Sequence, residues 1–215
     1  MRVKIKLSLI FSIFLIYTGI AQNNFYSEVT AIQEKYNKQI ESKLQHIVFT
    51  GSSSIRFWDN LPLVFNDYSI VNTGFGGSQA SDLLEVHQEL ILDFNPKKVF
   101  IYEGDNDIAF GKKSNKILKT IKKISRKIKR RSPDVTIVLI AAKPSIRRWN
   151  LKEKYIELNN KFERLSNRKK YIEYADVWSI MLEGDELNRT LFIQDGLHMN
   201  KKGYDLWEKT IKEFL

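Results

Sequence analysis

Short apolar runs rich in β-branched residues alternate along this chain with longer stretches whose apolar residues recur at helical spacing. The apolar runs lie at His46–Thr50, Tyr68–Asn72, Lys98–Glu103, Val135–Ala142 and Tyr171–Ala175. The helical stretches lie at Phe25–Lys43, Gln79–Asp93, Ser114–Arg130, Asn150–Leu165 and Lys201–Leu215. Continuous apolar strands separated by helices are typical of a parallel sheet covered on both faces. The pattern predicts an α/β fold, a single-domain three-layer α/β/α sandwich with a five-stranded parallel sheet.

The first 21 residues have the layout of a secretory signal peptide. Arg2, Lys4 and Lys6 precede an apolar stretch, and small residues stand at Gly19 and Ala21. A membrane anchor is the alternative, but the apolar stretch is about 14 residues long, against about 20 for a spanning helix. We therefore expect export to the periplasm or the medium after cleavage near Ala21. The expected organisation is a signal peptide at 1–21, an N-terminal helix within 22–44 and one domain over 45–215.

A strongly basic segment lies in the middle of the chain. Between Lys112 and Arg131 there are eleven Lys or Arg residues and no Asp or Glu. Isoleucines recur through it at helical spacing, which predicts one buried stripe on an otherwise basic helix. The simplest interpretation is a solvated helix face, and the alternative is a surface for an anionic partner. No aromatic residues are interleaved to stack on bases, so no nucleic acid is expected as a partner.

Small, polar and titratable residues follow each predicted strand. These segments are Gly51–Arg56, Asn72–Ser78, Glu103–Asp107, Lys143–Ser145 and, further on, Gln194–His198. In a parallel α/β fold the ligand binds beyond the carboxyl ends of the strands. The sequence therefore predicts a functional site at that edge of the sheet.

Asp195 and His198 stand three residues apart in a glycine-containing loop before the last helix. A carboxylate at that spacing can hold one imidazole nitrogen and leave the other free as a base. That base could activate a serine hydroxyl from the triple serine Ser52–Ser54 after the first strand. The alternative is that Asp195 and His198 merely cap the final helix. A serine mechanism also needs donors for a negative oxygen, and Gly77, Asn106 and the serine's own N–H could supply them.

No metal or cofactor is expected. The chain has no Cys, which also excludes disulfides and lipid attachment through an N-terminal Cys. Its other two histidines, His46 and His87, are scattered and read as ordinary strand and helix residues. The glycines after the second and third strands match neither the dinucleotide fingerprint nor the P-loop.

Four short blocks in order resemble the SGNH hydrolases, also called GDSL-type esterases or lipases. The blocks are Gly51-Ser52-Ser53, Asn72 to Gly77, Gly104-Asp105-Asn106-Asp107 and Asp195-Gly196-Leu197-His198. The glycine block is most similar to the branch with the platelet-activating-factor acetylhydrolase subunits. The resemblance implies a flavodoxin-like SGNH hydrolase fold.

The resemblance also implies roles for individual residues. Ser53 is the implied nucleophile, with His198 as base and Asp195 as its orienting acid. The N–H groups of Ser53 and Gly77 and the amide of Asn106 are the implied oxyanion donors. Ser52 departs from the family, which usually has Asp there. Ser54 is expected to cap the following helical turn, Trp58 to be packed and Arg56 to be solvated.

The sequence thus predicts an exported serine esterase acting on short acyl esters, acetyl esters in the first place, with a carbohydrate as one possible carrier. Lysophospholipid hydrolysis and acyl transfer are alternatives within the same family. A non-catalytic module that binds anionic polymers through 112–131 is the alternative from another class. The expected partner is a small acyl-ester substrate, such as an acetylated glycan or a lysophospholipid.

Overall fold

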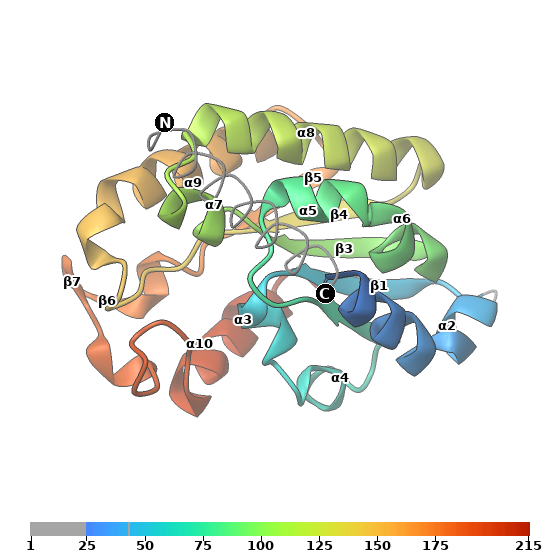
Figure 1. The fold of residues 1–215 in the computed structure, drawn as a ribbon, viewed down its shortest axis with the longest axis horizontal. Helices are drawn as coiled ribbons and strands as arrows, with labels where there is room; N and C mark the ends of the chain where they lie inside the picture. Colours follow the sequence, from blue (N-terminus) through green and yellow to red (C-terminus); the bar gives the residue numbers. More distant parts are fainter. Residues whose placement is uncertain (1–24, 43) are drawn as a thin grey trace, which may run out of the picture.

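A computed structural model of the chain describes residues 25–42 and 44–215. The predicted signal peptide at 1–21 lies outside the described residues. Five parallel strands form the central sheet in the order β2-β1-β3-β4-β5 (Figure 1). They are β1 (His46–Gly51), β2 (Ile70–Gly74), β3 (Pro96–Tyr102), β4 (Thr136–Ile140) and β5 (Ile172–Ala175). The predicted five-stranded parallel sheet is confirmed.

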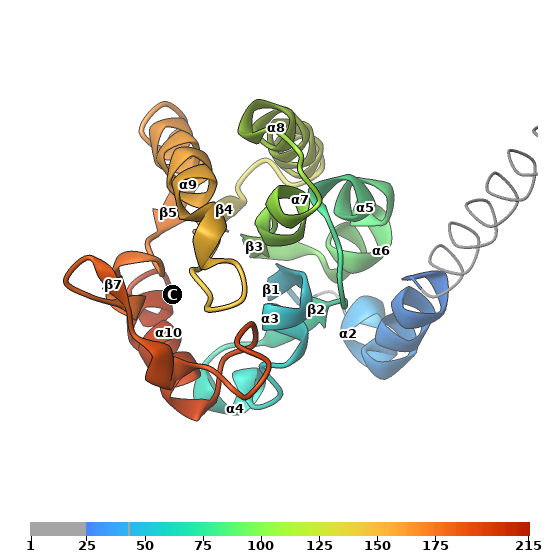
Figure 2. The ribbon, with the colours of Figure 1, turned by 60° about the vertical axis from the view of Figure 1, so that its left-hand side comes forward.

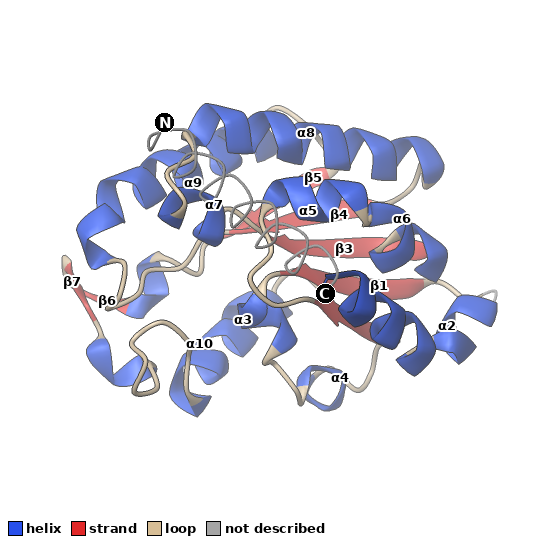
Figure 3. Ribbon diagram, viewed as in Figure 1, coloured by secondary structure: helices blue, strands red, loops and turns tan. Residues whose placement is uncertain are grey.

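Helices cover both faces of this sheet, as predicted. On one face lie α5 (Ala80–Glu85), α6 (His87–Leu90), α8 (Ser114–Arg131) and α9 (Lys152–Ser166), and on the other α3 (Ser53–Arg56), α4 (Leu61–Val64) and α10 (Lys201–Lys212) (Figures 1 and 2). The remaining helices are α2 (Asn37–Glu41), which follows a helix over 25–35, and α7 (Asp105–Ala109). Figure 3 shows the three layers, with the strands in red between the helices.

The strands are apolar because both of their faces are buried. Every residue of β1 is buried, and Phe49 stacks on Phe100 of β3 with ring centroids 4.1 Å apart. On the opposite face Val48 packs in a cluster with Tyr36 and Phe94. Such strands carry no polar alternation, which is why they read as continuous apolar runs.

Several predicted boundaries differ from the structure. The predicted helix Gln79–Asp93 is broken into α5, α6 and the short 3₁₀ helix η1 (Leu92–Phe94). The break between α5 and α6 falls at Val86, whose backbone (φ −102°, ψ 19°) leaves the helical conformation. Next to it, His87 Nδ1 lies 2.8 Å from the Leu84 carbonyl oxygen. The predicted helix Phe25–Lys43 is interrupted at Tyr36, and the last helix ends at Lys212 rather than Leu215.

The sequence predicted no helix or strand in the long segment between β5 and α10. It contains two short antiparallel strands, β6 (Leu182–Glu183) and β7 (Glu186–Leu187). The same segment contains the 3₁₀ helices η3 (Ser179–Met181) and η4 (Arg189–Leu191), and another 3₁₀ helix, η2 (Trp149–Leu151), lies between β4 and α9. Over the described ranges, no helix combines the length and apolar character needed to cross a membrane.

The basic helix α8 forms as predicted, with one end residue added. Its isoleucines Ile117, Ile121, Ile124 and Ile128 are all buried against the core. Most of its Lys and Arg side chains are exposed on the opposite side. Burial of the isoleucine stripe accounts for the stability of a helix so rich in like charges.

Candidate active site

The turn after β1 places Ser53 at the edge of the sheet. Gly51 ends the strand with φ of 126°, and a Cβ there would lie 2.0 Å from the Tyr102 carbonyl oxygen. Only glycine fits such a close approach at positive φ. The chain then turns at once, so that Ser53 becomes the first residue of α3.

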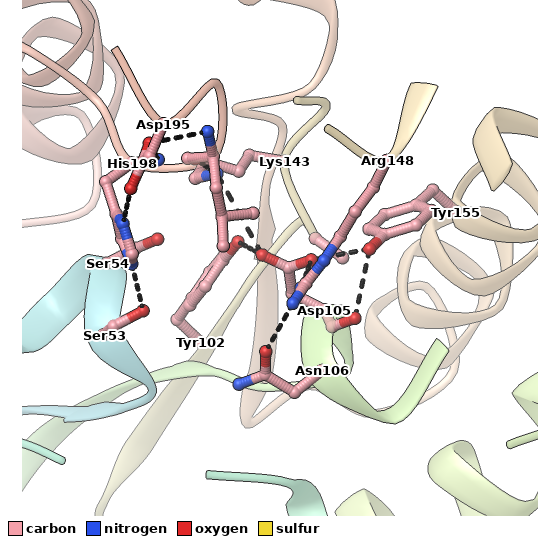
Figure 4. A network of polar contacts seen from close by, with 12 residues as sticks. Ser53, Ser54, Tyr102, Asp105, Asn106, Lys143, Arg148, Tyr155, Asp195 and His198 are labelled. Atoms are coloured by element: carbon pink, nitrogen blue, oxygen red, sulfur yellow. Dashed lines mark hydrogen bonds and ion pairs between the residues drawn. The ribbon is translucent and has the colours of Figure 1, made fainter. Parts of the chain in front are cut away.

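Ser53, His198 and Asp195 form one chain of hydrogen bonds (Figure 4). The Ser53 Oγ lies 2.9 Å from Nε2 of His198, and Nδ1 of His198 lies 2.5 Å from Oδ2 of Asp195. An ionised carboxylate can only accept, so Nδ1 carries the proton. Nε2 is then the acceptor for the serine hydroxyl. The structure therefore brings together all three residues of the predicted triad.

The loop around Asp195 holds this carboxylate through its own backbone. Oδ1 accepts from the N–H groups of Leu197 at 2.8 Å and His198 at 2.9 Å. Burial works to raise the pKa of Asp195, but these two N–H groups and the His198 side chain together lower it to about 2. Asp195 is thus ionised at neutral pH and available to orient His198.

The final helix is capped by a different residue. Asn200 Oδ1 accepts from the N–H groups of Lys202 and Gly203 at the start of α10. The alternative role for Asp195 and His198, as caps of this helix, is therefore not what the structure shows.

The other two serines of the triple serine are buried rather than presented at the site. Ser52 is the N-cap residue of α3, although its side chain makes no capping bond, and Ser54 lies inside the helix. The prediction that Ser54 caps the helix is wrong, because the helix starts one residue earlier, at Ser53. Trp58 is packed as predicted, with 1% of its surface exposed.

The glycine block lies beside Ser53 because β1 runs between β2 and β3 in the sheet. Gly77 has φ of 72°, and a Cβ there would meet no atom within 4 Å, so its surroundings are open. Gly76 donates its N–H to both carboxylate oxygens of Glu28, at 3.1 and 3.3 Å. The Glu28 carboxylate comes from the helix over 25–35, which is thereby tied to the glycine block.

Arg56 takes part in the same contact. Its Nε lies 2.8 Å from Glu28 Oε1, while about half of its side chain is exposed. Arg56 is partly exposed, as expected of a solvated side chain, but its ion pair with Glu28 was not predicted. Glu28 thus joins α3, which carries Ser53, to the glycine block.

Asn106 lies in α7, which follows β3, the strand that pairs with β1 on the side away from β2. Its Nδ2 donates to the Ser78 carbonyl at 2.8 Å, and its Oδ1 accepts from Arg148 at 3.0 Å. Because an amide nitrogen carries two hydrogens, one N–H remains for a ligand. Among residues 25–42 and 44–215, no hydrogen bond joins Asn106 or Gly77 to Ser53, His198 or Asp195, so these bonds leave both donors available beside the three residues.

A buried charged cluster next to Asn106 was missed by sequence reasoning. Asp105 accepts from Arg148 at 2.6 Å, Tyr155 at 2.6 Å and Tyr102 at 2.9 Å, and Lys143 lies 4.0 Å away (Figure 4). Burial works to raise the pKa of Asp105, but Lys143, Arg148 and Tyr155 outweigh it and hold the pKa below 3.8. The sequence signals were the positions of Asp105 and Lys143 directly after the third and fourth predicted strands, and neither Arg148 nor Tyr155 was singled out.

Two further acidic residues of the same segment support the loops around the site. Asp107 accepts from the Ala80 N–H at 2.9 Å and from Lys112 at 3.0 Å. Glu103 accepts from the Ser78 hydroxyl at 2.7 Å, and burial raises its pKa well above 4.5. Glu103 thus acts as a buried hydrogen-bonding group beside Ser78.

The described residues contain no group of three or more His, Cys, Asp or Glu that could hold a metal ion. His46 begins β1, at the edge opposite the site, and bonds to Ser42 and Ser69. His87 lies in α6.

In a comparison with known proteins, the sequence that forms this site matches a protein family. A profile described as the GDSL-like Lipase/Acylhydrolase family matches residues 49–206. That range contains every member of the triad and both flanking donors.

Solved structures share the fold. A protein of Streptococcus pneumonia, provisionally named a platelet activating factor, is 24% identical with a TM-score of 0.78, and the match covers 93% of this chain and 98% of that one. A GDSL-like lipase from Bacteroides thetaiotaomicron is 22% identical with a TM-score of 0.72, over 84% of this chain and 95% of that one. Both show the fold predicted from the sequence.

One curated relative is much longer than this chain. It is an N-acylneuraminate cytidylyltransferase from Escherichia coli, 29% identical over 188 residues. The match covers 86% of this chain and only 43% of the relative.

Proposed function

The chain belongs to the GDSL-like lipase/acylhydrolase family and is a hydrolase acting on esters, and from that premise we propose that it is an exported serine esterase that removes short acyl groups, acetyl foremost, from carbohydrates. The observation that carries the proposal is the hydrogen-bonded chain from Ser53 through His198 to Asp195. Such a chain supplies a nucleophile, a base and an orienting acid without any cofactor.

In this mechanism Ser53 Oγ attacks the carbonyl carbon of the ester while His198 Nε2 takes the serine proton. Asp195 stabilises the imidazolium that forms and keeps its ring in place. The carbonyl oxygen becomes negative and accepts from the N–H groups of Ser53 and Gly77 and from Asn106 Nδ2. Donors fixed before the reaction stabilise this charge without reorganising.

The second half returns the enzyme to its starting state. The tetrahedral intermediate collapses, and His198 gives its proton to the leaving alcohol oxygen. Ser53 is left as an acyl ester. Water then attacks this ester as His198 takes a water proton, and the acid leaves while His198 returns the proton to Ser53 Oγ.

The carbohydrate part of the proposal is supported by the curated relative. Its name describes an activity on N-acylneuraminate, which is an acylated sugar acid. The chain matches less than half of that relative, so cytidylyl transfer is not carried over. The expected export of the chain is consistent with a glycan outside the cytoplasm as the substrate.

Alanine substitutions across the triple serine test the nucleophile. Hydrolysis of p-nitrophenyl acetate and butyrate is measured for the parent protein and for Ser52→Ala, Ser53→Ala and Ser54→Ala. We expect a loss of several orders of magnitude for Ser53→Ala alone. Equal activity in all four proteins would mean that the triad mechanism is wrong.

A panel of natural esters then tests the substrate class. Acetate release from acetylated glycans is compared with fatty-acid release from lysophospholipids, with Ser53→Ala as the blank. Preference for the glycans supports the proposal. Activity on long-chain lipids alone would replace it with a lysophospholipase.

The exposed face of α8 supports a second role, the binding of an anionic polymer. Nine of its eighteen residues are Lys or Arg and none is acidic. Binding to such a polymer should weaken steeply as salt rises and should survive Ser53→Ala. Retention on heparin–agarose at low salt, compared between the parent and a variant with Lys119, Lys122 and Lys123 changed to Gln, checks this role. Equal retention of the two proteins would exclude it.

A further inference from the structure

Arg148 contacts two consecutive residues at the start of α7 with one planar group. Its Nη1 donates to Asp105 Oδ1 at 2.6 Å, and its Nη2 donates to Asn106 Oδ1 at 3.0 Å (Figure 4). Arg148 lies just before η2, in the segment that follows β4. The contact therefore joins the fourth strand's loop to the loop of the third strand.

The orientation of the guanidinium is fixed by the groups around Asp105. Tyr155 of α9 donates to the same Oδ1 at 2.6 Å, and Tyr102 of β3 donates to Oδ2 at 2.9 Å. The side chains of Asp105 and Arg148 are 6% and 16% exposed. A guanidinium held by a buried carboxylate keeps its two donors in one plane and in one direction.

This orientation decides which way the Asn106 amide faces. An amide can present either its oxygen or its nitrogen to a neighbour, and a guanidinium can only donate. Arg148 therefore requires Oδ1 on its side, which turns Nδ2 away from it. On that other side Nδ2 donates to the Ser78 carbonyl, which can only accept. The two contacts agree, and one N–H of Nδ2 remains.

We propose that Arg148 is a positioning residue that fixes the Asn106 amide with its nitrogen toward the reacting ester. The inference rests on the proposed function, in which Asn106 Nδ2 holds the oxyanion. Through Asn106 and its bond to the Ser78 carbonyl, Arg148 is also linked to the residue that follows Gly77. Its effect is thus on the transition state, where the negative oxygen exists, and not on the binding of the ester.

A double-mutant cycle on kcat tests this role. The parent, Arg148→Met, Asn106→Ala and the double variant are assayed on p-nitrophenyl acetate. We expect Asn106→Ala to lower kcat about 10²- to 10³-fold, as for loss of an oxyanion donor, and Arg148→Met to lower it about 10- to 100-fold. The double variant should match Asn106→Ala, because Arg148 acts through that amide. KM should stay within about threefold in all of them.

If the fold-loss in kcat of the double variant equals the product of the two single losses, the inference is overturned, because Arg148 then does not act through Asn106. Arg148→Lys is the second variant, since a single ammonium keeps the charge beside Asp105 but cannot make both directed contacts. We expect Arg148→Lys to lose kcat nearly as much as Arg148→Met. Full activity in Arg148→Lys would show that charge alone suffices, which also contradicts the inference. If Arg148→Met does not fold, Arg148→Lys takes its place in the cycle.

Two controls separate the possible failures. Arg147 is the exposed neighbour of Arg148, and Arg147→Met should leave kcat unchanged. This result would show that the loss of a positive charge in this loop does not by itself lower kcat. Ser53→Ala is run in the same assay. Activity in Ser53→Ala would defeat the proposed function itself, whereas an inactive Ser53→Ala with a multiplicative cycle defeats only the role of Arg148.

Discussion

Two aspartates of this site remain ionised by different means. Asp195 has a third of its side chain exposed, and its donors are the backbone and ring of residues two and three positions away. Asp105 has only 6% of its side chain exposed, and its donors include Arg148 and Tyr155, more than forty residues away. The Asp195 carboxylate is held by residues of its own loop, and the Asp105 carboxylate is held mainly by residues that are distant in sequence. We therefore expect substitutions of Asp195 to affect catalysis and those of Asp105 to affect stability.

The largest expected effect is on the activity of Asp195→Asn. An Asn side chain can donate to His198 Nδ1, which places the ring proton on Nε2, where it can no longer accept from Ser53. We expect kcat to fall about 10³- to 10⁴-fold, as for this change in other serine triads. Steady-state hydrolysis of p-nitrophenyl acetate measures it. A loss below tenfold would mean that Asp195 does not orient the base.

The next effect is on the stability of Asp105→Asn. The change leaves Arg148 and Lys143 buried beside a neutral group. Removal of one partner from a buried ion cluster costs about 3–5 kcal/mol in the free energy of unfolding. Urea unfolding measures it, with the exposed Asp134→Asn as a control that should stay within about 0.5 kcal/mol of the parent. Equal urea midpoints for Asp105→Asn and Asp134→Asn would mean that the stability of the fold does not depend on Asp105.

A smaller effect concerns pH and Asp195 alone. Its pKa is about 2 in the folded protein, below the ordinary 3.8. A lowered pKa stabilises the fold above the unfolded value, and this stabilisation is lost as pH falls through the folded value. The difference in unfolding free energy between the parent and Asp195→Asn should be constant above pH 5 and shrink between pH 4 and about 2. Solvent screening keeps it below about 1 kcal/mol. Urea midpoints across that pH range test the direction, and a difference that grows toward low pH would contradict it.

The smallest expected effect is that of Glu28→Gln. The amide oxygen can still accept from the Gly76 N–H, and only the half-exposed ion pair with Arg56 is lost. Such pairs contribute at most about 1 kcal/mol, so kcat should fall less than about fivefold. The exposed Glu34→Gln on the same helix serves as the control. A much larger loss of kcat would mean that the site depends on the ion pair between Glu28 and Arg56.

The same contrast explains how much the sequence could predict. Asp195 and His198 were found because they are close in sequence, and a serine from the turn after the first strand was expected as their partner. The choice of Ser53 among the three serines came from the resemblance to the SGNH hydrolases. The alternation of apolar runs with helical stretches predicted the parallel sheet. The positions of Gly77 and Asn106 after predicted strands indicated that both would lie near the serine.

The cluster of Asp105, Lys143, Arg148 and Tyr155 could not be found in this way. Its members come from different elements, and no periodicity relates residue 105 to residue 148. The break within Gln79–Asp93 was missed as well, since the apolar pattern continues through Val86, where the backbone leaves the helical conformation. Contacts that form only after packing leave no local pattern in a sequence.

The bond between Ser53 and His198 spans 145 residues of chain. During synthesis the serine therefore leaves the ribosome long before its base exists. Until the last loop docks, Ser53 is an ordinary alcohol with a negligible rate of attack on esters. In the proposed mechanism, esterase activity therefore requires a chain that has been made and folded through His198, and a product truncated before His198 is inactive.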